Sequence, residues 1–281
     1  MGFGCNAVGV TGCRIIDSKR ERLMAMITNA FVPCNGRFPT LIALISMFVV
    51  IGGGAASGVW SALVLLGVIL VSIFATFAMS KLLSHTVLRG EVSSFTLELP
   101  PYRTPKVWQV IVRSVFDRTL FVLGRAVAVA APAGLVLWAL ANLRVGDMSL
   151  LFWLSTLLDP VGRFFGMDGV ILLAFLLALP ANEIAIPIML MAYTASGSLT
   201  DYSSLTELRG ILAANGWTVT TALCVIFFTL FHFPCSTTLV TIKKESGKWR
   251  WAVLSAVLPT VVGLIICLAV RVLSYLLDFV L

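Results

Sequence analysis

The stretch that decides the fold is Gly169–Tyr193, with the sequence GVILLAFLLALPANEIAIPIMLMAY. This apolar run is interrupted near its middle by Pro180, Asn182 and Glu183. Its halves, about 11 and 10 residues long, are each too short to cross a bilayer core of about 30 Å. A turn at membrane depth is tolerated where it lines a cavity or is buried in protein. The run therefore predicts a broken helix that enters the membrane and returns as a re-entrant hairpin.

The charges of the flanking segments support this interpretation. Arg14–Arg37 has five basic and two acidic residues, Lys81–Arg118 six and three, and Lys243–Arg250 four and one. In contrast, Arg144–Asp168 has two basic and three acidic residues, and Ser196–Asn215 one and two. Basic loops stay in the cytoplasm, which places the first three segments inside and the last two outside. Every loop lies on its preferred side only if the run is re-entrant.

The composition of the whole chain indicates an integral membrane protein. Of the 281 residues, 59% are hydrophobic and 12% charged, and the mean hydropathy is +1.01. Soluble domains have about 45–50% apolar and about 25% charged residues. An ordinary cytosolic enzyme, a disordered chain and a nucleic-acid-binding module are therefore excluded, and the net charge of +7 is interpreted as topology. Nucleotide-binding, zinc-protease and Ser-His-Asp motifs are absent from the sequence, so we expect no enzyme.

The remaining apolar runs predict an all-α, polytopic transmembrane helical protein with broken or re-entrant helices. Two spans form an antiparallel hairpin around Gly52–Gly58, because that link is short. The amphipathic segment Val107–Arg118 is expected at the membrane interface, and Arg144–Asp168 as an interfacial helix plus loop interrupted at Asp159-Pro160. The expected spans are Arg37–Ile51, Val59–Met79, Thr119–Ala141, Trp217–Phe233 and Trp251–Leu276.

Glu183 is the carboxylate inside the broken apolar run. An ionisable group within a membrane costs about 2.5–3.5 kcal/mol on insertion scales, so it is a functional candidate by default. Broken helices that meet near the membrane midplane are how secondary transporters build ion sites. The alternative is that Glu183 caps a half-helix or pairs with a buried arginine such as Arg125.

Three of the six cysteines, Cys5, Cys34 and Cys235, lie at edges of apolar segments, where helices end and backbone carbonyl groups are released. A soft thiolate beside oxygen ligands suits a transition metal such as Fe(II) better than Mg or Na. The alternative is ordinary buried cysteine, which is common. Cys224 and Cys267 lie in the middle of spans and are expected to serve packing. The spacing is not that of a disulfide scaffold, so we expect free thiols.

His232 lies close to Cys235 and has two possible roles. It could ligate a metal ion or carry protons, or it could hydrogen-bond a neighbouring carbonyl group, as a lone histidine more often does.

Several motifs together resemble the FeoB family of bacterial ferrous iron transporters. Pro180–Glu183 is similar to its broken-helix element, and Leu99–Arg103 to its linker before the second gate region. The resemblance makes Cys5 and Cys34 the first-gate cysteines and Cys235 the second-gate cysteine, whereas Cys13 has no counterpart. The motifs resembling the two gate regions are Gly2–Asn6, Arg14, Asp17–Leu23 and Pro33–Pro39 for the first, and Pro234–Glu245 and Trp249–Trp251 for the second.

The resemblance implies a multi-pass permease of the bacterial inner membrane that takes up Fe(II) as its transported substrate. In the family, an N-terminal GTPase domain drives or regulates uptake. This sequence contains neither that domain nor the helices before the first gate, so we expect a C-terminal part that binds no GTP itself. Its expected partners are ferrous iron, the lipid membrane, the N-terminal GTPase and membrane half, and further copies of itself in a homo-oligomer; no nucleic acid is expected.

The resemblance also suggests a division of the chain. Residues 1–50 contain the first gate motif and the following transmembrane helix, and residues 51–106 a transmembrane helix and cytoplasmic linker. Residues 107–245 form the second gate region, and residues 246–281 the C-terminal transmembrane helix. The metal-binding residues are expected to be Cys5, Cys34, Cys235 and Glu183. Two alternatives stay open: a non-transporting membrane subunit that completes a partner transporter, and a permease for nucleosides or other organic solutes on a related gate fold.

Overall fold

The computed structural model describes residues 2–49, 55–88, 106–113, 115–116, 120–146, 148–199, 202 and 204–280. The described chain is helical apart from one antiparallel hairpin of two-residue strands, β1 (Arg144–Val145) and β2 (Met148–Ser149). This confirms the all-α, polytopic fold class. Four segments of the described chain are long and apolar enough to cross a membrane: Lys19–Phe48, Gly58–His85, Val219–Ser246 and Trp249–Leu277.

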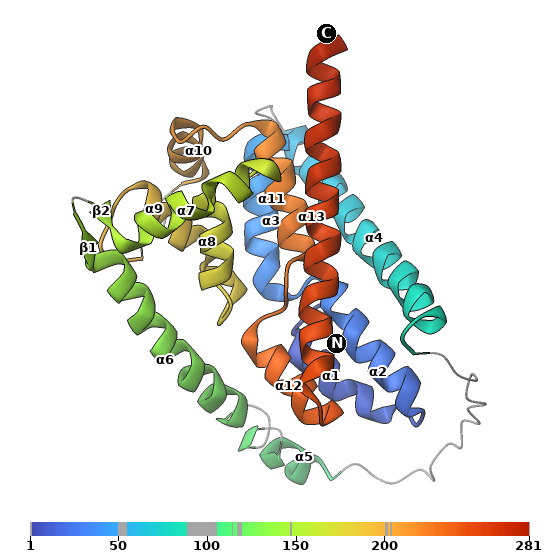
Figure 1. Cartoon of the computed structure of the whole chain (residues 1–281). Helices are drawn as coiled ribbons and strands as arrows, with labels where there is room; N and C mark the ends of the chain where they lie inside the picture. Colours follow the sequence, from blue (N-terminus) through green and yellow to red (C-terminus); the bar gives the residue numbers. More distant parts are fainter. Residues whose placement is uncertain are drawn as a thin grey trace.

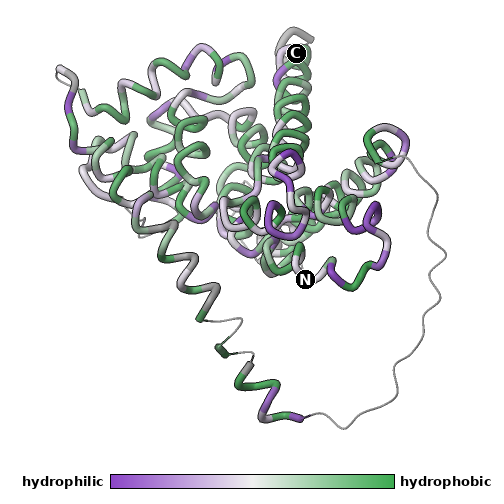
Figure 2. Tube along the Cα trace, turned by 60° about the horizontal axis from the view of Figure 1, so that its bottom comes forward, coloured by the Kyte–Doolittle hydropathy of each residue, from purple (hydrophilic) through white to green (hydrophobic). Residues whose placement is uncertain are grey.

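Two of these segments are the long helices α4 (Ala55–His85) and α13 (Trp249–Val280), which contain two of the expected spans. Both helices are predominantly hydrophobic along their length (Figure 2). Many of their apolar side chains are exposed, such as Phe74 at 76% and Ile265 at 60%. Large exposed apolar faces on long helices are the expected condition of segments that meet lipid.

The other two segments are broken helices that lie side by side in opposite directions (Figure 1). In the first, α2 (Lys19–Thr28) is followed by a break and then by α3 (Phe38–Leu44). In the second, α11 (Val219–Phe231) is followed by a break and then by α12 (Ser236–Ser246), and α3 packs against α11.

A proline lies within each of these breaks, where it cannot donate a backbone hydrogen bond. These residues are Pro33 and Pro234. The first candidate span begins at Lys19, not at Arg37 as expected, because α2 places its basic residues in its first turn and continues with apolar ones.

The run that decided the fold forms two helices of nine residues each, α8 (Gly169–Leu177) and α9 (Ala185–Tyr193). Each is about 14 Å long, half the thickness of a bilayer core. The two helices pack against each other. The hydroxyl of Tyr193, at the end of α9, donates a hydrogen bond to the carboxylate of Asp168, at the start of α8. The chain therefore enters and leaves this hairpin at the same end, which makes the run re-entrant.

The helix α7 (Leu150–Phe164) precedes the hairpin and is bent by 110° from α8. Pro160 lies inside α7, so the break expected at Asp159-Pro160 lies instead between α7 and α8. A side chain at Gly169 would be impossible here, since its Cβ atom would lie 1.9 Å from the backbone oxygen of Ser155. This glycine allows the close packing of α7 on α8.

Four further helices complete the described chain. The helix α1 (Asn6–Gly12) packs against α12, and Arg14 and Glu245 join the two regions by paired hydrogen bonds of 2.7 and 2.6 Å. Besides α1, these helices are α5 (Val107–Arg113), α6 (Phe121–Asn142) and α10 (Leu205–Ala214). The helix α6 overlaps the expected span Thr119–Ala141, but it is not one of the four segments of the described chain that are long and apolar enough to cross a membrane.

Some of the segments discussed from the sequence lie outside the residues that the structure describes. The Gly52-Gly53-Gly54 turn and the linker Leu99–Arg103 lie outside them, as does the side chain of Arg125.

Candidate functional site

The three chain breaks meet at one place, which we call the junction: residues 32–37, 178–184 and 232–236, together with Gly4 and Cys5 of the N-terminal segment beside them. The backbone N–H of Ser236 donates to the carbonyl of Leu179 at 2.8 Å, which joins the second broken helix to the tip of the hairpin. The backbone N–H of Asn35 donates to the carbonyl of Gly4 at 3.3 Å, which brings the N-terminal segment to the first break. Segments that are distant in sequence thus form one polar site.

Arg37 lies at the centre of the junction and is fully buried, with 0% of its surface exposed. Its guanidinium donates to the carbonyl of Leu230 at 2.9 Å and to that of His232 at 2.8 Å, at the end of α11. A longer contact of 3.4 Å reaches the carbonyl of Ala30, before the first break. Arg37 therefore satisfies carbonyl groups that the two broken helices release, and its positive charge lies beside them.

Asn182 links the hairpin tip to both broken helices. Its side-chain amide lies between Cys34 and His232: the amide nitrogen donates to the thiol sulfur at 4.0 Å, and the amide oxygen lies 3.3 Å from Nε2 of His232. All three side chains are buried. The other imidazole nitrogen, Nδ1, lies 2.9 Å from the carbonyl oxygen of Thr229. His232 thus contacts a neighbouring carbonyl, one of its two expected roles.

The structure places the predicted cysteines at different depths of the junction. Cys34 is buried, whereas Cys235 is half-buried and its sulfur lies 3.3 Å from the hydroxyl of Thr238. Both thiols lie within electrostatic range of the Arg37 guanidinium. Cys5 is half-buried at the start of α1, next to the Gly4 carbonyl that Asn35 contacts.

Glu183 occupies the short 3-10 turn that follows the break in the hairpin, and its side chain is exposed. It lies directly over Gly36: a Cβ atom added to this glycine would lie 3.0 Å from Oε1 of Glu183. In the described part of the chain, no side chain forms a hydrogen bond or an ion pair with this carboxylate. Glu183 is therefore next to the first gate motif with its carboxylate available.

The described residues hold no cluster of three or more histidine, cysteine or carboxylate side chains close enough to bind a metal ion. The assignment of Cys5, Cys34, Cys235 and Glu183 as ligands stays a prediction. The buried side-chain polar atoms without a partner, among the residues that the structure describes, are Arg37 Nε, Thr229 Oγ1 and Ser236 Oγ. All three belong to the junction or to the last turn of α11 before it, and unpaired buried polar atoms require an explanation such as a functional role.

The other three cysteines lie away from the junction. Cys224 of α11 and Cys267 of α13 are buried, and each sulfur contacts the backbone oxygen of the other residue, at 3.7 and 3.2 Å. Cys13 contacts the carbonyl of Gly9 at 3.3 Å, and partial burial raises the pKa of its thiol.

Sequence reasoning did not single out Arg37 or Asn182. Both stand inside quoted motifs, Pro33–Pro39 and Pro180–Glu183. The signal for Arg37 was available: a charged side chain at the start of an apolar run must find buried partners, and two broken helices supply unpaired carbonyl groups.

These features define a class: a helical membrane protein with discontinuous helices whose breaks meet at a polar centre, an architecture used by secondary transporters. Comparison with known proteins narrows the class. Residues 65–118 match the family model described as "Ferrous iron transport protein B C terminus". The chain is therefore similar to the C-terminal portion of the FeoB family.

Three relatives illustrate the match. The chain is 24% identical to an "Fe(2+) transport protein A/Fe(2+) transporter FeoB fusion protein" of Porphyromonas gingivalis, over 92% of this chain and 35% of that protein. It is 26% identical to the "Fe(2+) transporter FeoB" of Staphylococcus aureus strain MW2, over 95% of this chain and 38% of that protein. The "Fe(2+) transporter FeoB" of Campylobacter jejuni is 25% identical to the chain, over 89% of this chain and 41% of that protein. The chain thus spans about two fifths of the length of these relatives. No solved structure matches it.

Proposed function

We propose that this chain forms part of the pathway through which a ferrous iron transporter carries Fe(II) across the bacterial inner membrane, entering the cell. The observation that carries the proposal is the meeting of three chain breaks around Cys34, Asn182 and His232. The names of the relatives supply the ion, since each is described as a transporter of Fe(2+).

The chemistry of the junction supports a transient site for Fe(II). Cys34, Cys235 and Cys5 offer soft sulfur ligands, while Asn182 and Glu183 offer oxygen ligands, a mixture that suits a borderline metal ion. Sulfur ligands disfavour Ca and Mg, but softness alone does not exclude Zn(II), Co(II) or Mn(II), so we expect imperfect selectivity. A sparse set of ligands binds weakly enough for the ion to leave, which conduction requires.

The buried Arg37 restricts how an ion is held. Its positive charge opposes a bound cation, and it already occupies the carbonyl groups of Leu230 and His232. We therefore expect an ion at the junction to rely mainly on side chains. The thiols of Cys34 and Cys235, which lie within electrostatic range of Arg37, offset its charge when they are present as thiolates.

The relatives are longer than this chain, and we propose that the missing part includes a GTPase domain that drives or regulates transport. In this proposal the chain itself binds no GTP, performs no catalysis and works with the N-terminal half of the transporter.

The test is uptake of radioactive Fe(II) into proteoliposomes that contain the full chain, alone and with the GTPase-bearing half. Cys5→Ser, Cys34→Ser and Cys235→Ser are measured singly and together, with Cys13→Ser as the matched control because its thiol lies outside the junction. We expect the triple variant to lose most uptake and Cys13→Ser to keep it. A folded triple variant with unchanged uptake would show that these cysteines are not needed.

The same assay separates the alternatives. If uptake of Fe(II) requires this chain but is unchanged by substitutions of its junction residues, the chain is a non-transporting subunit that completes a partner transporter. If it takes up radioactive nucleosides and not Fe(II), the chain is an organic-solute permease.

A further inference from the structure

Two cysteines outside the junction face each other across the contact between α11 and α13. The sulfur of Cys224 lies 3.7 Å from the backbone oxygen of Cys267, and the sulfur of Cys267 lies 3.2 Å from the backbone oxygen of Cys224. The two thiol groups also lie within interaction range of each other. Both residues are fully buried, and both thiols are free. Because each side chain points towards the other residue, the pair meets a basic requirement for a disulfide bond, which is that the Cβ vectors do not point apart.

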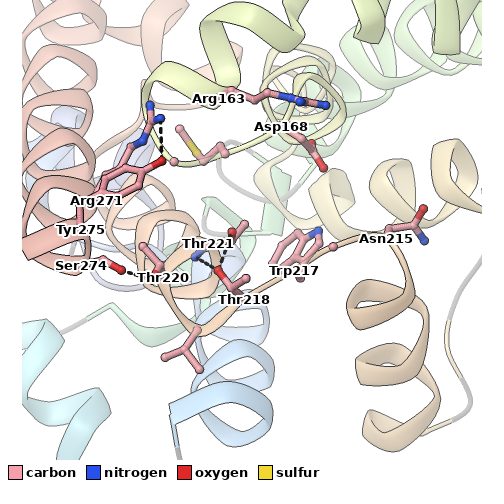
Figure 3. Close-up of a pocket in the computed structure, with 14 residues that line it drawn as sticks. Arg163, Asp168, Asn215, Trp217, Thr218, Thr220, Thr221, Arg271, Ser274 and Tyr275 are labelled. Carbon is pink, nitrogen blue, oxygen red and sulfur yellow. Dashed lines mark hydrogen bonds between the residues drawn. The ribbon is translucent and has the colours of Figure 1, made fainter. Parts of the chain in front are cut away.

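Contacts on either side of the pair hold the two antiparallel helices close together. One turn before Cys267, a Cβ atom added to Gly263 would lie 3.2 Å from the Cβ atom of Phe231. Nearer the end of α13, the hydroxyl groups of Thr220 and Ser274 form a hydrogen bond of 2.8 Å (Figure 3). A disulfide bond forms without backbone movement only where the two backbones are close. The flanking contacts keep them close at the position of the cysteines.

The pair lies near the outer surface of the membrane. Cys267 follows Trp249, the first residue of α13, by 18 residues, which corresponds to about 27 Å of helix. The bilayer core is about 30 Å thick. The basic segment Lys243–Arg250, at the start of α13, is expected in the cytoplasm, so the cysteines lie towards the opposite surface. The compartment outside the bacterial inner membrane is one in which disulfides form and persist.

A polar cavity gives water-soluble reagents a route to the pair. The cavity has a volume of about 760 Å³ and lies between the turn from α7 to α8, the start of α11 and the end of α13 (Figure 3). Gly166 lines it, and a Cβ atom added to this glycine would lie 3.0 Å from the sulfur of Cys224. The sulfur thus lies directly behind a residue without a side chain in the cavity wall.

We propose that Cys224 and Cys267 are a redox site, in which they form a reversible disulfide bond that fixes α11 to α13 on the outer side of the membrane. The oxidant is an external disulfide. One thiolate of the pair attacks it and releases one of its sulfurs as a thiol, and the second thiolate then attacks the mixed disulfide and releases the other. The pair loses two electrons and two protons, and the external disulfide gains them as it becomes two thiols.

The bond would act on the helix that leads to the junction. The last turn of α11 carries the carbonyl of Leu230, to which Arg37 donates a hydrogen bond. Fixing the outer part of α11 to α13 therefore restricts the helix whose inner end is held at the junction.

The test uses glutathione disulfide, which does not cross membranes, added to right-side-out and inside-out vesicles that contain the full chain. Free thiols are then blocked with N-ethylmaleimide, and the peptides are mapped by mass spectrometry without reduction. We expect a peptide cross-linked between Cys224 and Cys267 in right-side-out vesicles, its loss on treatment with dithiothreitol, and its absence from inside-out vesicles. The oxidised chain should also unfold several degrees higher in detergent, because the bond joins residues 43 positions apart in the sequence.

Cys224→Ala is the matched control. This variant should form no internal cross-link at Cys267, and glutathione disulfide should leave its melting temperature unchanged. Three outcomes with the unaltered chain would overturn the proposal: no cross-linked peptide, equal formation in both vesicle orientations, or a cross-link that leaves the melting temperature unchanged. None of these measurements involves iron uptake, so their result is independent of the proposed function, and none of the three depends on the folding of a variant.

Discussion

The hydroxyl of Tyr193 donates a hydrogen bond to the carboxylate of Asp168, and this contact closes the open end of the re-entrant hairpin. Asp168 also caps α8 by accepting from the N–H of Ile171 at 2.7 Å. The indole N–H of Trp217 in turn donates to the Tyr193 hydroxyl at 2.9 Å. One chain of hydrogen bonds thus holds both ends of the hairpin against the start of α11, so the tip that bears Asn182 is anchored from the opposite end.

Replacing Tyr193 by Phe should loosen this anchor. The change removes a hydrogen bond to a charged group and leaves the indole N–H of Trp217 without its acceptor, which should cost about 1.5–3 kcal/mol of unfolding free energy. Thermal unfolding in detergent measures the effect. Tyr275→Phe is the control, because its hydroxyl makes only a 3.3 Å contact with the exposed side of Arg271. Equal melting temperatures for both variants would contradict a role for the anchor.

The re-entrant path makes a prediction about sidedness. Cysteines introduced at Met148 and Ser198, before and after the hairpin, should react with a membrane-impermeant maleimide from the same side, whereas a cysteine at Lys248 should react from the other. Met148 and Lys248 are exposed, and Cys224 and Cys267 are buried. Mass spectrometry of inside-out and right-side-out vesicles identifies the labelled sites. Labelling of positions 148 and 198 from opposite sides would mean that the run crosses the membrane once.

The hairpin could be predicted from sequence because its length and its loop charges are local quantities. Two halves of about ten residues cannot cross a bilayer, whatever they pack against. The break between α7 and α8 could not be predicted in the same way. Pro160 suggested a break, but α7 continues through it, and the chain bends where Gly169 lets the backbone approach that of Ser155. That close approach is a tertiary contact, which a local sequence pattern does not predict.

The candidate site likewise has residues that local sequence indicates and residues whose role depends on tertiary contacts. Cys34, Cys235 and Glu183 were chosen as candidates because thiols and carboxylates at the ends of apolar runs are conspicuous. Arg37 was overlooked because its role depends on carbonyl groups of Leu230 and His232, almost 200 residues away. The sequence indicated that the breaks release carbonyl groups, but only the fold shows that Arg37 donates to two of them.

Substitution of Arg37 by Lys should therefore destabilise the protein although it keeps the charge. A lysine cannot reach the Leu230 and His232 carbonyls with a planar pair of donors, and a buried acceptor left unpaired costs about 1–3 kcal/mol. Arg22→Lys is the control, because Arg22 donates to the carbonyls of Ile16 at 2.9 Å and of Asp17 at 3.5 Å from a less buried position. A melting temperature lowered no more than that of Arg22→Lys would show that Arg37 does not hold the breaks together.

Gly169→Ala should destabilise the packing of the hairpin on α7. The added methyl group would lie 1.9 Å from the oxygen of Ser155 and 2.7 Å from the backbone nitrogen of Asp159, so helices α7 and α8 must separate. Overpacking of this kind costs about 1–3 kcal/mol or more. Gly210→Ala in α10 has open space around it and serves as the control for thermal unfolding. Equal stability of the two variants would contradict the close packing.

Gly36→Ala tests whether the position of the Glu183 carboxylate matters for transport. The new methyl group would lie 3.0 Å from Oε1 and 3.1 Å from Cγ of Glu183. Because Glu183 is exposed and its end is flexible, the side chain can move away, and the melting temperature should fall by no more than a few degrees. If the carboxylate guides Fe(II), this displacement should lower uptake several-fold, as should Glu183→Gln, which removes the charge without changing the shape. Gly67→Ala in α4, where nothing lies within 4 Å, is the matched control and should leave uptake unchanged. Normal uptake by both Gly36→Ala and Glu183→Gln would show that Glu183 does not contact Fe(II) during transport. The thiols and Asn182 would then be the remaining candidate ligands of the ion.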